Sequence, residues 1–226
     1  MAAGPKDPPG RREARRVQLQ ELARTQLLDA AETVLGDKGV HAATIKEIAE
    51  LAEYSVGSVY SFFEGKDDLV LAVLARRGDE MLDGIRRIVG AGGEPLDRIV
   101  ALARFELGFF RERPAFARLY LRSSAVGDLL PDFARDAGVL DHYHEAMART
   151  AGVLAEGQAS GSVCDGPSML LARVLSGIVT AYQAVLADDP TLALPDTHLD
   201  ELVRRTFGRG PAGTASDRPN LEKGPA

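Results

Sequence analysis

Cysteine is almost missing from the 226-residue sequence, and Cys164, its single one, excludes a disulfide within the chain. A lone thiol is consistent with a reducing cytoplasm. No apolar run approaches the roughly 18–20 residues that span a bilayer, and no apolar stretch follows the charged N-terminal residues as in a secretory signal. We therefore expect a cytoplasmic protein without a membrane partner.

Catalytic signatures are also missing from the sequence. It has no glycine-rich phosphate loop, no Ser/His/Asp order and no pair of carboxylates in a catalytic setting. His142 and His144 suggest a metal site, but residues two apart on a helix point about 200° away from each other and do not converge on one ion. We expect no enzyme activity, no metal and no cofactor.

Positive charge is scarce in the chain as a whole. The formal net charge of −6 argues mildly against a polyanionic partner such as nucleic acid. The distribution argues the other way, because Arg11, Arg12, Arg15 and Arg16 crowd the N-terminus. We expect this basic arm to contact the phosphates of a nucleic acid, and the alternative is a solvated basic tail.

Apolar residues recur at three- and four-residue steps along nearly the whole chain, and no segment alternates strictly, which predicts an all-α fold. The Pro- and Gly-rich ends, 1–14 and 208–226, are expected to be disordered. Between them, a three-helix helix-turn-helix domain over 15–65 precedes a helical bundle over 66–207. The expected helices span 15–37, 44–51, 55–62, 66–89, 94–113, 114–124, 131–159, 167–186 and 195–207.

The first expected helix carries one apolar stripe that should face a core. The stripe consists of Leu19, Leu22, Leu27, Ala30, Ala31, Val34 and Leu35. Gly39 ends this helix, because glycine accepts the positive φ that helix C-termini favour. Thr44 and Glu47 have the spacing of a capping box, which predicts the start of the next helix.

The two short helices 44–51 and 55–62 are separated by a three-residue turn. This spacing is typical of a helix-turn-helix, whose second helix enters the DNA major groove while the first braces it. The small core that fixes the angle between them is expected to consist of Ile45, Ile48, Ala49, Val59 and Phe63.

The second short helix exposes small or hydroxyl-bearing residues, which let its backbone approach DNA closely. Tyr60 and Ser58 are placed to reach phosphates or base edges, and Lys66 is placed for an ionic phosphate contact. Together with the basic arm, the residues expected to contact DNA are Arg11, Arg12, Arg15, Arg16, Thr44, Ser55, Val56, Gly57, Ser58, Tyr60, Ser61, Phe62 and Lys66.

The stretch from Arg24 to Leu69 resembles the signature of the TetR family of transcriptional regulators. The residues that carry the resemblance are Leu27-Leu28, Ala30-Ala31, Gly39, Thr44, Ile48-Ala49 and Ser55-x-Gly57-Ser58-x-Tyr60-x-Phe62-Phe63-x-x-Lys66-Asp67-x-Leu69. Two departures matter. Glu53 stands at the common turn-glycine position, where a positive φ would cost about 1 kcal/mol, and Phe62 replaces a common Tyr or His that supplies a polar DNA contact.

The resemblance implies a homodimeric DNA-binding regulator, most simply a repressor. It would leave a pseudo-palindromic operator in double-stranded DNA when an unidentified small-molecule effector enters the C-terminal domain. Glu53, Phe62 and the local acidity motivate an alternative, a helical ligand-binding or protein-interaction module whose helix-turn-helix is vestigial.

The expected helix 167–186 is apolar almost all round, so it must be covered on both sides. Together with the last helix and their copies in a second subunit it could form a four-helix dimer interface; burial inside a monomer is the alternative. The small residues that would permit a close crossing are Ala172, Ser176, Gly177, Thr180, Ala181 and Ala184.

Aromatic residues concentrate in the expected helices 94–113 and 114–124. Together with Met and Tyr residues from other helices they could line an apolar effector pocket, although aromatics at helical spacing are more often plain core. The candidate pocket consists of Met81, Phe105, Phe109, Phe116, Tyr120, Tyr143, Met147 and Tyr182.

Overall fold

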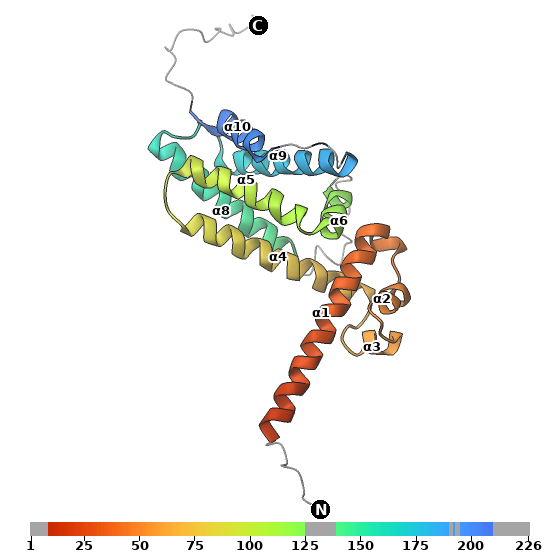
Figure 1. The fold of residues 1–226 in the computed structure, drawn as a ribbon. Helices are drawn as coiled ribbons and strands as arrows, with labels where there is room; N and C mark the ends of the chain where they lie inside the picture. The colour runs from red at the N-terminus through yellow and green to blue at the C-terminus, as the bar shows by residue number, and fades with distance from the viewer. Residues whose placement is uncertain (1–8, 125–138, 190–191, 193–194, 210–226) are drawn as a thin grey trace, which may run out of the picture.

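The computed structural model describes residues 9–124, 139–189, 192 and 195–209, and the regular structure in these ranges is helical, as predicted (Figure 1). An isolated β-bridge joins Val163 to Gly208. The helices are α1 (Pro9–Ala42), α2 (Ile45–Leu51), α3 (Val56–Tyr60), α4 (Lys66–Gly90), α5 (Pro95–Arg111), α6 (Pro114–Ser124), α8 (Val139–Ser160), α9 (Ser168–Asp188) and α10 (Asp196–Phe207).

Local chemistry sets the helix boundaries near the N-terminus. Gly39 has φ 79 and ψ 165, so the regular part of α1 ends there as predicted. Thr44 and Glu47 form the predicted capping box at the start of α2, because each side chain satisfies a backbone N–H that the helix leaves free. Ser55 caps α3, which ends at Tyr60 and is therefore shorter than the expected helix 55–62.

Helix α1 differs from its prediction at its N-terminal end. It begins at Pro9, so the part of the expected disordered arm from 9 to 14 is helical. Leu27 is fully buried, but Leu19 and Leu22 are more than half exposed. The predicted stripe is therefore wrong for its first two members, because α1 projects past the rest of the molecule and has nothing to cover them (Figure 1).

The described residues form two hydrophobic cores. The smaller N-terminal core joins α1, α2 and α3 to the start of α4, the end of α5 and α6. The larger C-terminal core joins the rest of α4 and α5 to α8, α9 and α10. Helices α4 and α5 thus belong to both cores, and Met81 and Phe105 touch both. The smaller core extends past the predicted domain boundary between residues 65 and 66 into the start of α4, and that boundary stays a prediction.

Helix α6 is packed tightly on α1 (Figure 1). A Cβ atom added to Gly36 of α1 would overlap the backbone carbonyl of Ala115 in α6. The two backbones therefore touch, which only glycine permits at this position.

Helix α9 is long and apolar enough to cross a membrane by length and composition, with a mean hydropathy of 1.6 over Ser168–Ala187. This corrects the expectation that no run approaches this length. A core helix passes the same test, and α9 packs along α8, α5 and α6.

The C-terminal end of the described chain continues past α10. The backbone N–H of Arg209 donates to the carbonyl of Ser162 at 3.1 Å, and the N–H of Cys164 donates to the carbonyl of Phe207 at 2.8 Å. The start of the expected disordered tail is therefore held in place. The rest of that tail, 210–226, and the first part of the expected helix 131–159 lie outside the described residues.

Candidate functional site

Helices α2 and α3 and the turn between them have the arrangement of a helix-turn-helix. Ile48, Ala49, Val59 and Phe63 are buried between them, as predicted, and Ile45 packs partly buried against the same core. The turn closes where the N–H of Tyr54 donates to the carbonyl of Ala49 at 2.9 Å.

Glu53, in this turn, adopts a left-handed backbone with φ 61. The sequence left two possibilities for this position, a turn that avoids positive φ or one that tolerates it. The structure shows the second, in a residue whose Cβ makes this conformation unfavourable.

Helix α3 presents small side chains on its outer surface. Val56, Gly57 and Tyr60 are exposed, and Tyr60 is 55% exposed. The Ser55 hydroxyl accepts from the N–H of Ser58 at 3.0 Å, and the Ser61 hydroxyl donates to the Ser58 carbonyl at 2.6 Å. These hydroxyls are thus used partly within α3, whereas the Tyr60 ring reaches outward.

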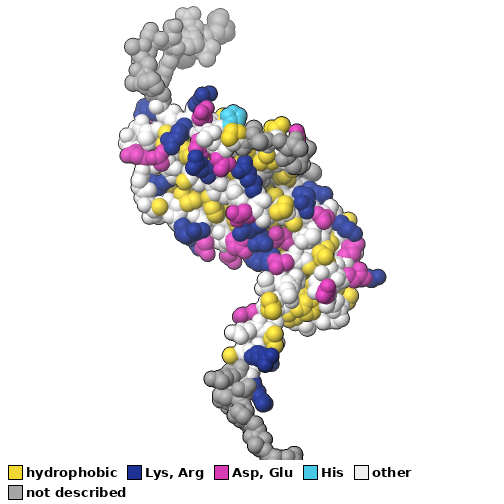
Figure 2. Space-filling model, in the orientation of Figure 1, with side chains coloured by type: hydrophobic (Ala, Val, Ile, Leu, Met, Phe, Trp, Pro, Cys, Tyr) yellow, Lys and Arg dark blue, Asp and Glu magenta, His cyan; other side chains and the backbone are white. Residues whose placement is uncertain are grey.

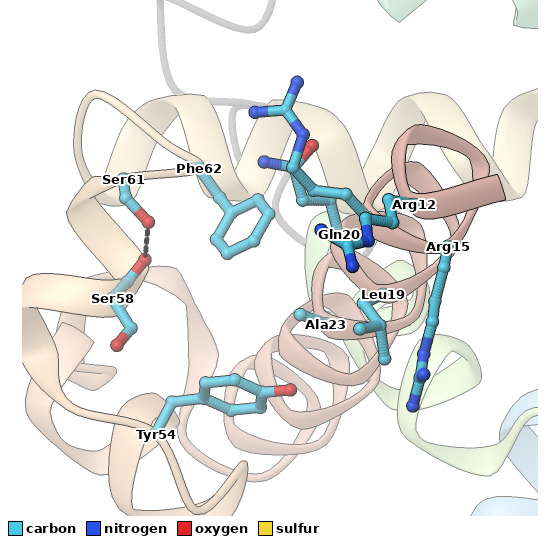
Figure 3. Close-up of a pocket in the computed structure, with 10 residues that line it drawn as sticks. Arg12, Arg15, Leu19, Gln20, Ala23, Tyr54, Ser58, Ser61 and Phe62 are labelled. Carbon is cyan, nitrogen blue, oxygen red and sulfur yellow. Dashed lines mark hydrogen bonds between the residues drawn. The ribbon is translucent and has the colours of Figure 1, made fainter. Parts of the chain in front are cut away.

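An open groove of about 460 Å³ lies between the projecting end of α1 and helix α3 (Figure 3). Side chains from both elements and from the turn line it: Arg12, Arg15, Arg16, Leu19, Gln20, Ala23, Tyr54, Ser58, Ser61 and Phe62. Leu19, Gln20, Ala23 and Tyr54 were not predicted for this site, because the position of α1 opposite α3 depends on tertiary packing that local sequence patterns do not show.

Arginines give this groove its charge. Arg16 pairs with Glu13 at 2.6 Å, whereas among the described residues no carboxylate lies within ion-pair distance of Arg12 or Arg15. In Figure 2 Lys and Arg side chains mark the projecting end of α1. The phenol of Tyr54 donates to Gln26 at 2.8 Å, which holds the turn against α1. Arg11 belongs to the same helical end.

Thr44 is exposed, but its side chain is used within the capping box. It receives the N–H of Glu47 at 3.3 Å and donates its hydroxyl to the Glu47 carboxylate at 2.9 Å. Hydrogen bonds from Lys38 and then from Thr44 lower the pKa of Glu47. A DNA contact by Thr44 therefore remains a prediction for a residue that already has a structural role.

Lys66 has a structural role as well. Its ammonium donates to the carbonyls of His41 and Ala43 at 3.4 and 3.3 Å. These carbonyls follow the kink at Gly39, so Lys66 fixes the end of α1 to the start of α4. A phosphate contact by Lys66 stays a prediction, and that contact would have to share the ammonium with these carbonyls.

The residues expected to line an effector pocket are divided between the two cores. Phe109 and Phe116 are buried in the smaller core with ring centroids 6.2 Å apart, and Tyr120 packs there against Phe110 at 4.9 Å. Tyr143, Met147 and Tyr182 belong to the larger core. Phe105 and Met81 lie where the cores meet. The eight residues thus do not form one cluster.

The residues expected at a dimer interface are also divided. Ala172 is buried in the larger core, so its assignment is wrong. Gly177 and Ala181 are exposed, whereas Ser176, Thr180 and Ala184 are half-buried. Three exposed apolar residues, Leu170, Val174 and Val185, share the stripe of Gly177 and Ala181 along α9.

The two histidines considered for a metal site do not meet. His142 contacts the Asp79 carboxylate of α4 at 2.9 Å, and His144 is exposed. Within the described part of the chain no group of three or more His, Cys, Asp or Glu residues is arranged to hold a metal ion.

A cluster of ion pairs that the sequence analysis missed joins α1, α4 and the end of α5. The Glu32 carboxylate of α1 is buried and accepts from Arg77 at 2.7 Å and from Arg76 at 3.1 Å. Glu80, next along α4, accepts from Arg77 at 2.7 Å and from Arg113 at 3.2 Å. The Arg113 guanidinium also lies 4.0 Å over the Phe109 ring. Only the Arg77–Glu80 pair is local, and no local pattern marks the other ion pairs, because their partners are 33 to 45 residues apart.

Comparison with known proteins gives matches to one family model and to individual proteins. Residues 27–73 match the model of the family described as bacterial regulatory proteins, tetR family. The HTH-type transcriptional activator FasR of Mycolicibacterium smegmatis is 31% identical over 142 residues, which are 55% of this chain and 65% of FasR. The chain thus spans just under two thirds of that relative.

Solved structures show the same fold over most of the chain. The ketosteroid transcriptional regulator KstR2 of Mycobacterium tuberculosis has a TM-score of 0.68 at 21% identity, covering 83% of this chain and 95% of KstR2. AibR, solved in complex with isovaleryl coenzyme A and operator DNA, has a TM-score of 0.69 at 14% identity, covering 82% of this chain and 98% of AibR. At these identities the likeness concerns the fold.

Proposed function

Since the chain belongs, through residues 27–73, to the tetR family of bacterial regulatory proteins, we propose that it is a sequence-specific DNA-binding transcriptional regulator. Its action is that of a repressor released from its operator by a small-molecule effector. The observation that carries this proposal is the shared groove between the arginine-bearing end of α1 and the exposed face of α3. It unites a helix suited to the major groove with cations suited to phosphates.

Helix α3 is the element that reads sequence in this proposal. Its small exposed residues allow the backbone to come close to base edges, and Tyr60 reaches a phosphate or sugar beside the groove. Arg12 and Arg15 contact phosphates on the same duplex, which offsets the net charge of −6 locally.

A homodimer is the proposed assembly. The stripe of Leu170, Val174, Gly177, Ala181 and Val185 leaves an apolar face of α9 uncovered, and water contact along a whole apolar helix face is unfavourable. A second copy covers it, and the twofold axis then places two α3 helices about 34–36 Å apart, which requires a pseudo-palindromic operator.

The effector acts through α4 and α6 in this mechanism. Both helices contact α1 and also pack against helices of the effector-binding bundle. A change in the shape of the bundle therefore shifts the position of α1. The ligand favours whichever arrangement binds it better, and DNA release follows from that difference in affinity. The protein therefore works at DNA in the cytoplasm and needs no catalysis.

Selection of bound duplexes from a random-sequence pool tests the proposal. We expect a pseudo-palindromic consensus, bound with an affinity that falls steeply with salt. Tyr60→Ala should weaken binding to this duplex at least about tenfold, with Tyr60→Phe in between if the hydroxyl meets a phosphate. A pool with no enriched sequence would support the alternative, a module whose helix-turn-helix is vestigial.

Arg15→Ala supplies a second readout. Loss of one phosphate contact should lower the log–log salt slope by about 0.9. Arg205→Ala is the matched control, because Arg205 is an exposed arginine on α10, far from α3 (Figure 1). Equal slopes for the wild type and Arg15→Ala would remove α1 from the interface.

A further inference from the structure

Glu106 of α5 is a buried carboxyl group inside the helical bundle. Its side chain is 7% exposed. It lies three residues after Ala103 of the larger core and four before Phe110 of the smaller one, so it occupies the apolar stripe of α5 where the two cores meet. Burial raises its pKa to about 7.

No cation in the described part of the chain neutralises Glu106. The arginines of α5 are all taken by carboxylates of other helices. Arg98 pairs with Glu156, Arg104 with Asp200 and Arg111 with Asp196. An ionised Glu106 therefore has no cation to balance its charge, and burying a carboxylate without such a partner is costly in free energy.

Gln183 of α9 is a second buried polar side chain without a partner. It is 6% exposed, and neither its amide nitrogen nor its amide oxygen makes a hydrogen bond. Gln183 follows Val179 by four residues and so continues the inward stripe of α9. Such groups are rare in folded proteins and call for a partner of some kind.

Glu106 of α5 and Gln183 of α9 are expected to lie at a similar height along the axes of the packed helices. A Cβ at Gly157 of α8 would lie 3.1 Å from the Pro95 side chain, so the start of α5 is level with residue 157. Moving about 16 Å along α5 to Glu106 corresponds to moving back to Met147 on antiparallel α8. Helix α8 ends at Ser160 and α9 begins at Ser168, so the two helices run in opposite directions from a short connection. Gln183 of α9 therefore lies at about the same height in the bundle as Met147 of α8.

A third polar group lies about one turn further along α8. Thr150 is fully buried, and its hydroxyl has no hydrogen-bond partner. The three helices pack against one another in pairs, and Figure 1 shows α5, α8 and α9 side by side. A carboxyl, an amide and a hydroxyl without partners are thus buried on three helices that pack against one another, and a few polar groups in an apolar interior are typical of small-molecule sites.

From this constellation we infer that the effector is an apolar molecule carrying one protonated amine, which pairs with the Glu106 carboxylate and donates to the Gln183 carbonyl. The inference rests on the proposed function, since it names the chemical class of the effector. An anionic ligand, such as a fatty acid, would place a second negative charge beside Glu106 whenever this carboxyl is ionised, so we expect it to bind more weakly than the amine.

Isothermal titration of the purified full-length protein, without DNA, tests the inference with three probes of equal chain length. The probes are octylammonium, 1-octanol and octanoate. We expect octylammonium to bind at least about tenfold more tightly than octanoate, with octanol in between. Octanoate binding as tightly as octylammonium, or no octylammonium binding at millimolar concentration, would overturn the inference.

Two variants assign the preference to named residues. Glu106→Gln should abolish the advantage of octylammonium over octanol while octanol still binds, and Gln183→Leu should weaken both. Glu201→Gln is the control, because it makes the same change on exposed α10. If the Glu106→Gln variant still prefers octylammonium over octanol as strongly as the wild type does, the inference is wrong.

Failure here is separable from failure of the proposed function. Operator binding is measured without any amine, and amine binding is measured without DNA. A protein that selects an operator but prefers octanoate keeps the proposed function and loses the inference. One that prefers octylammonium but selects no DNA does the reverse.

Discussion

At position 53 the backbone of the turn between α2 and α3 has φ 61 with a glutamate side chain. Glycine adopts this conformation without the steric cost of a Cβ. We expect Glu53→Gly to raise the free energy of unfolding by about 1 kcal/mol. Urea unfolding followed by circular dichroism measures this change.

The control for that substitution is Glu50→Gly. Glu50 is an exposed residue of α2 with helical backbone, so the same change should lower the stability by about 1 kcal/mol. If Glu53→Gly lowers the free energy of unfolding as Glu50→Gly does, the left-handed backbone at Glu53 carries no energetic cost.

Glu106 makes the stability depend on pH. The folded protein holds the proton up to a pKa of about 7, whereas the ordinary value is 4.5. Between these values the folded state binds more protons than the unfolded state, so its stability falls as the pH rises through this window. The contribution is present below 4.5, is lost above about 7 and is on the order of 3 kcal/mol.

Glu106→Gln removes this titration, so the variant should gain stability relative to the wild type as the pH rises. Urea unfolding of both proteins at about pH 5 and about pH 8 gives the difference, in which the other carboxylates cancel. The exposed Glu201→Gln variant should show no such trend. Parallel pH profiles for wild type and Glu106→Gln would contradict the burial argument.

At the scale of elements, the buried Glu32 carboxylate joins α1 to α4 through two arginines. Glu32→Gln leaves Arg76 and Arg77 partly desolvated with a weaker acceptor. We expect a loss of about 2–4 kcal/mol in the free energy of unfolding. The same change at exposed Glu21, on the same helix, should change it by less than about 0.5 kcal/mol. Thermal unfolding of both variants decides between them.

The elements most fully predicted from the sequence are those that local chemistry determines. The capping box of Thr44 and Glu47, the Ser55 cap and the stop at Gly39 each depend on residues within four positions of one another. The helix-turn-helix core followed from the same local spacing, so the central part of the candidate site was predictable.

Features that depend on distant neighbours were not predictable. Leu19 and Leu27 belong to the same predicted apolar stripe of α1. Leu27 is buried and Leu19 is exposed, because the N-terminal core ends between them. Lys66 was expected to meet phosphate, but the kink at Gly39 places two carbonyls within its reach. Glu106 offered a signal that could have been used, a carboxyl in the middle of an apolar stripe.

At the scale of the whole molecule, the exposed stripe of α9 predicts a dimer that one charge can break. Val174→Glu places a carboxylate in the centre of that stripe, and the monomer should still fold because Val174 is 39% exposed. Size-exclusion chromatography with light scattering should show a monomer, and affinity for a two-half-site duplex should fall at least about tenfold. Leu22→Glu, an exposed change on α1, should leave the dimer intact.

Gly36 lies against the Ala115 carbonyl of α6, near the C-terminal end of the long helix α1. From Gly36 to Arg12 the helix extends about 36 Å, so a tilt of only about 5° at this contact sweeps the arginine end through about 3 Å. That sweep equals the length of a hydrogen bond. In the proposed complex with DNA, a tilt of this size would be enough to separate Arg12 from a phosphate that it contacts.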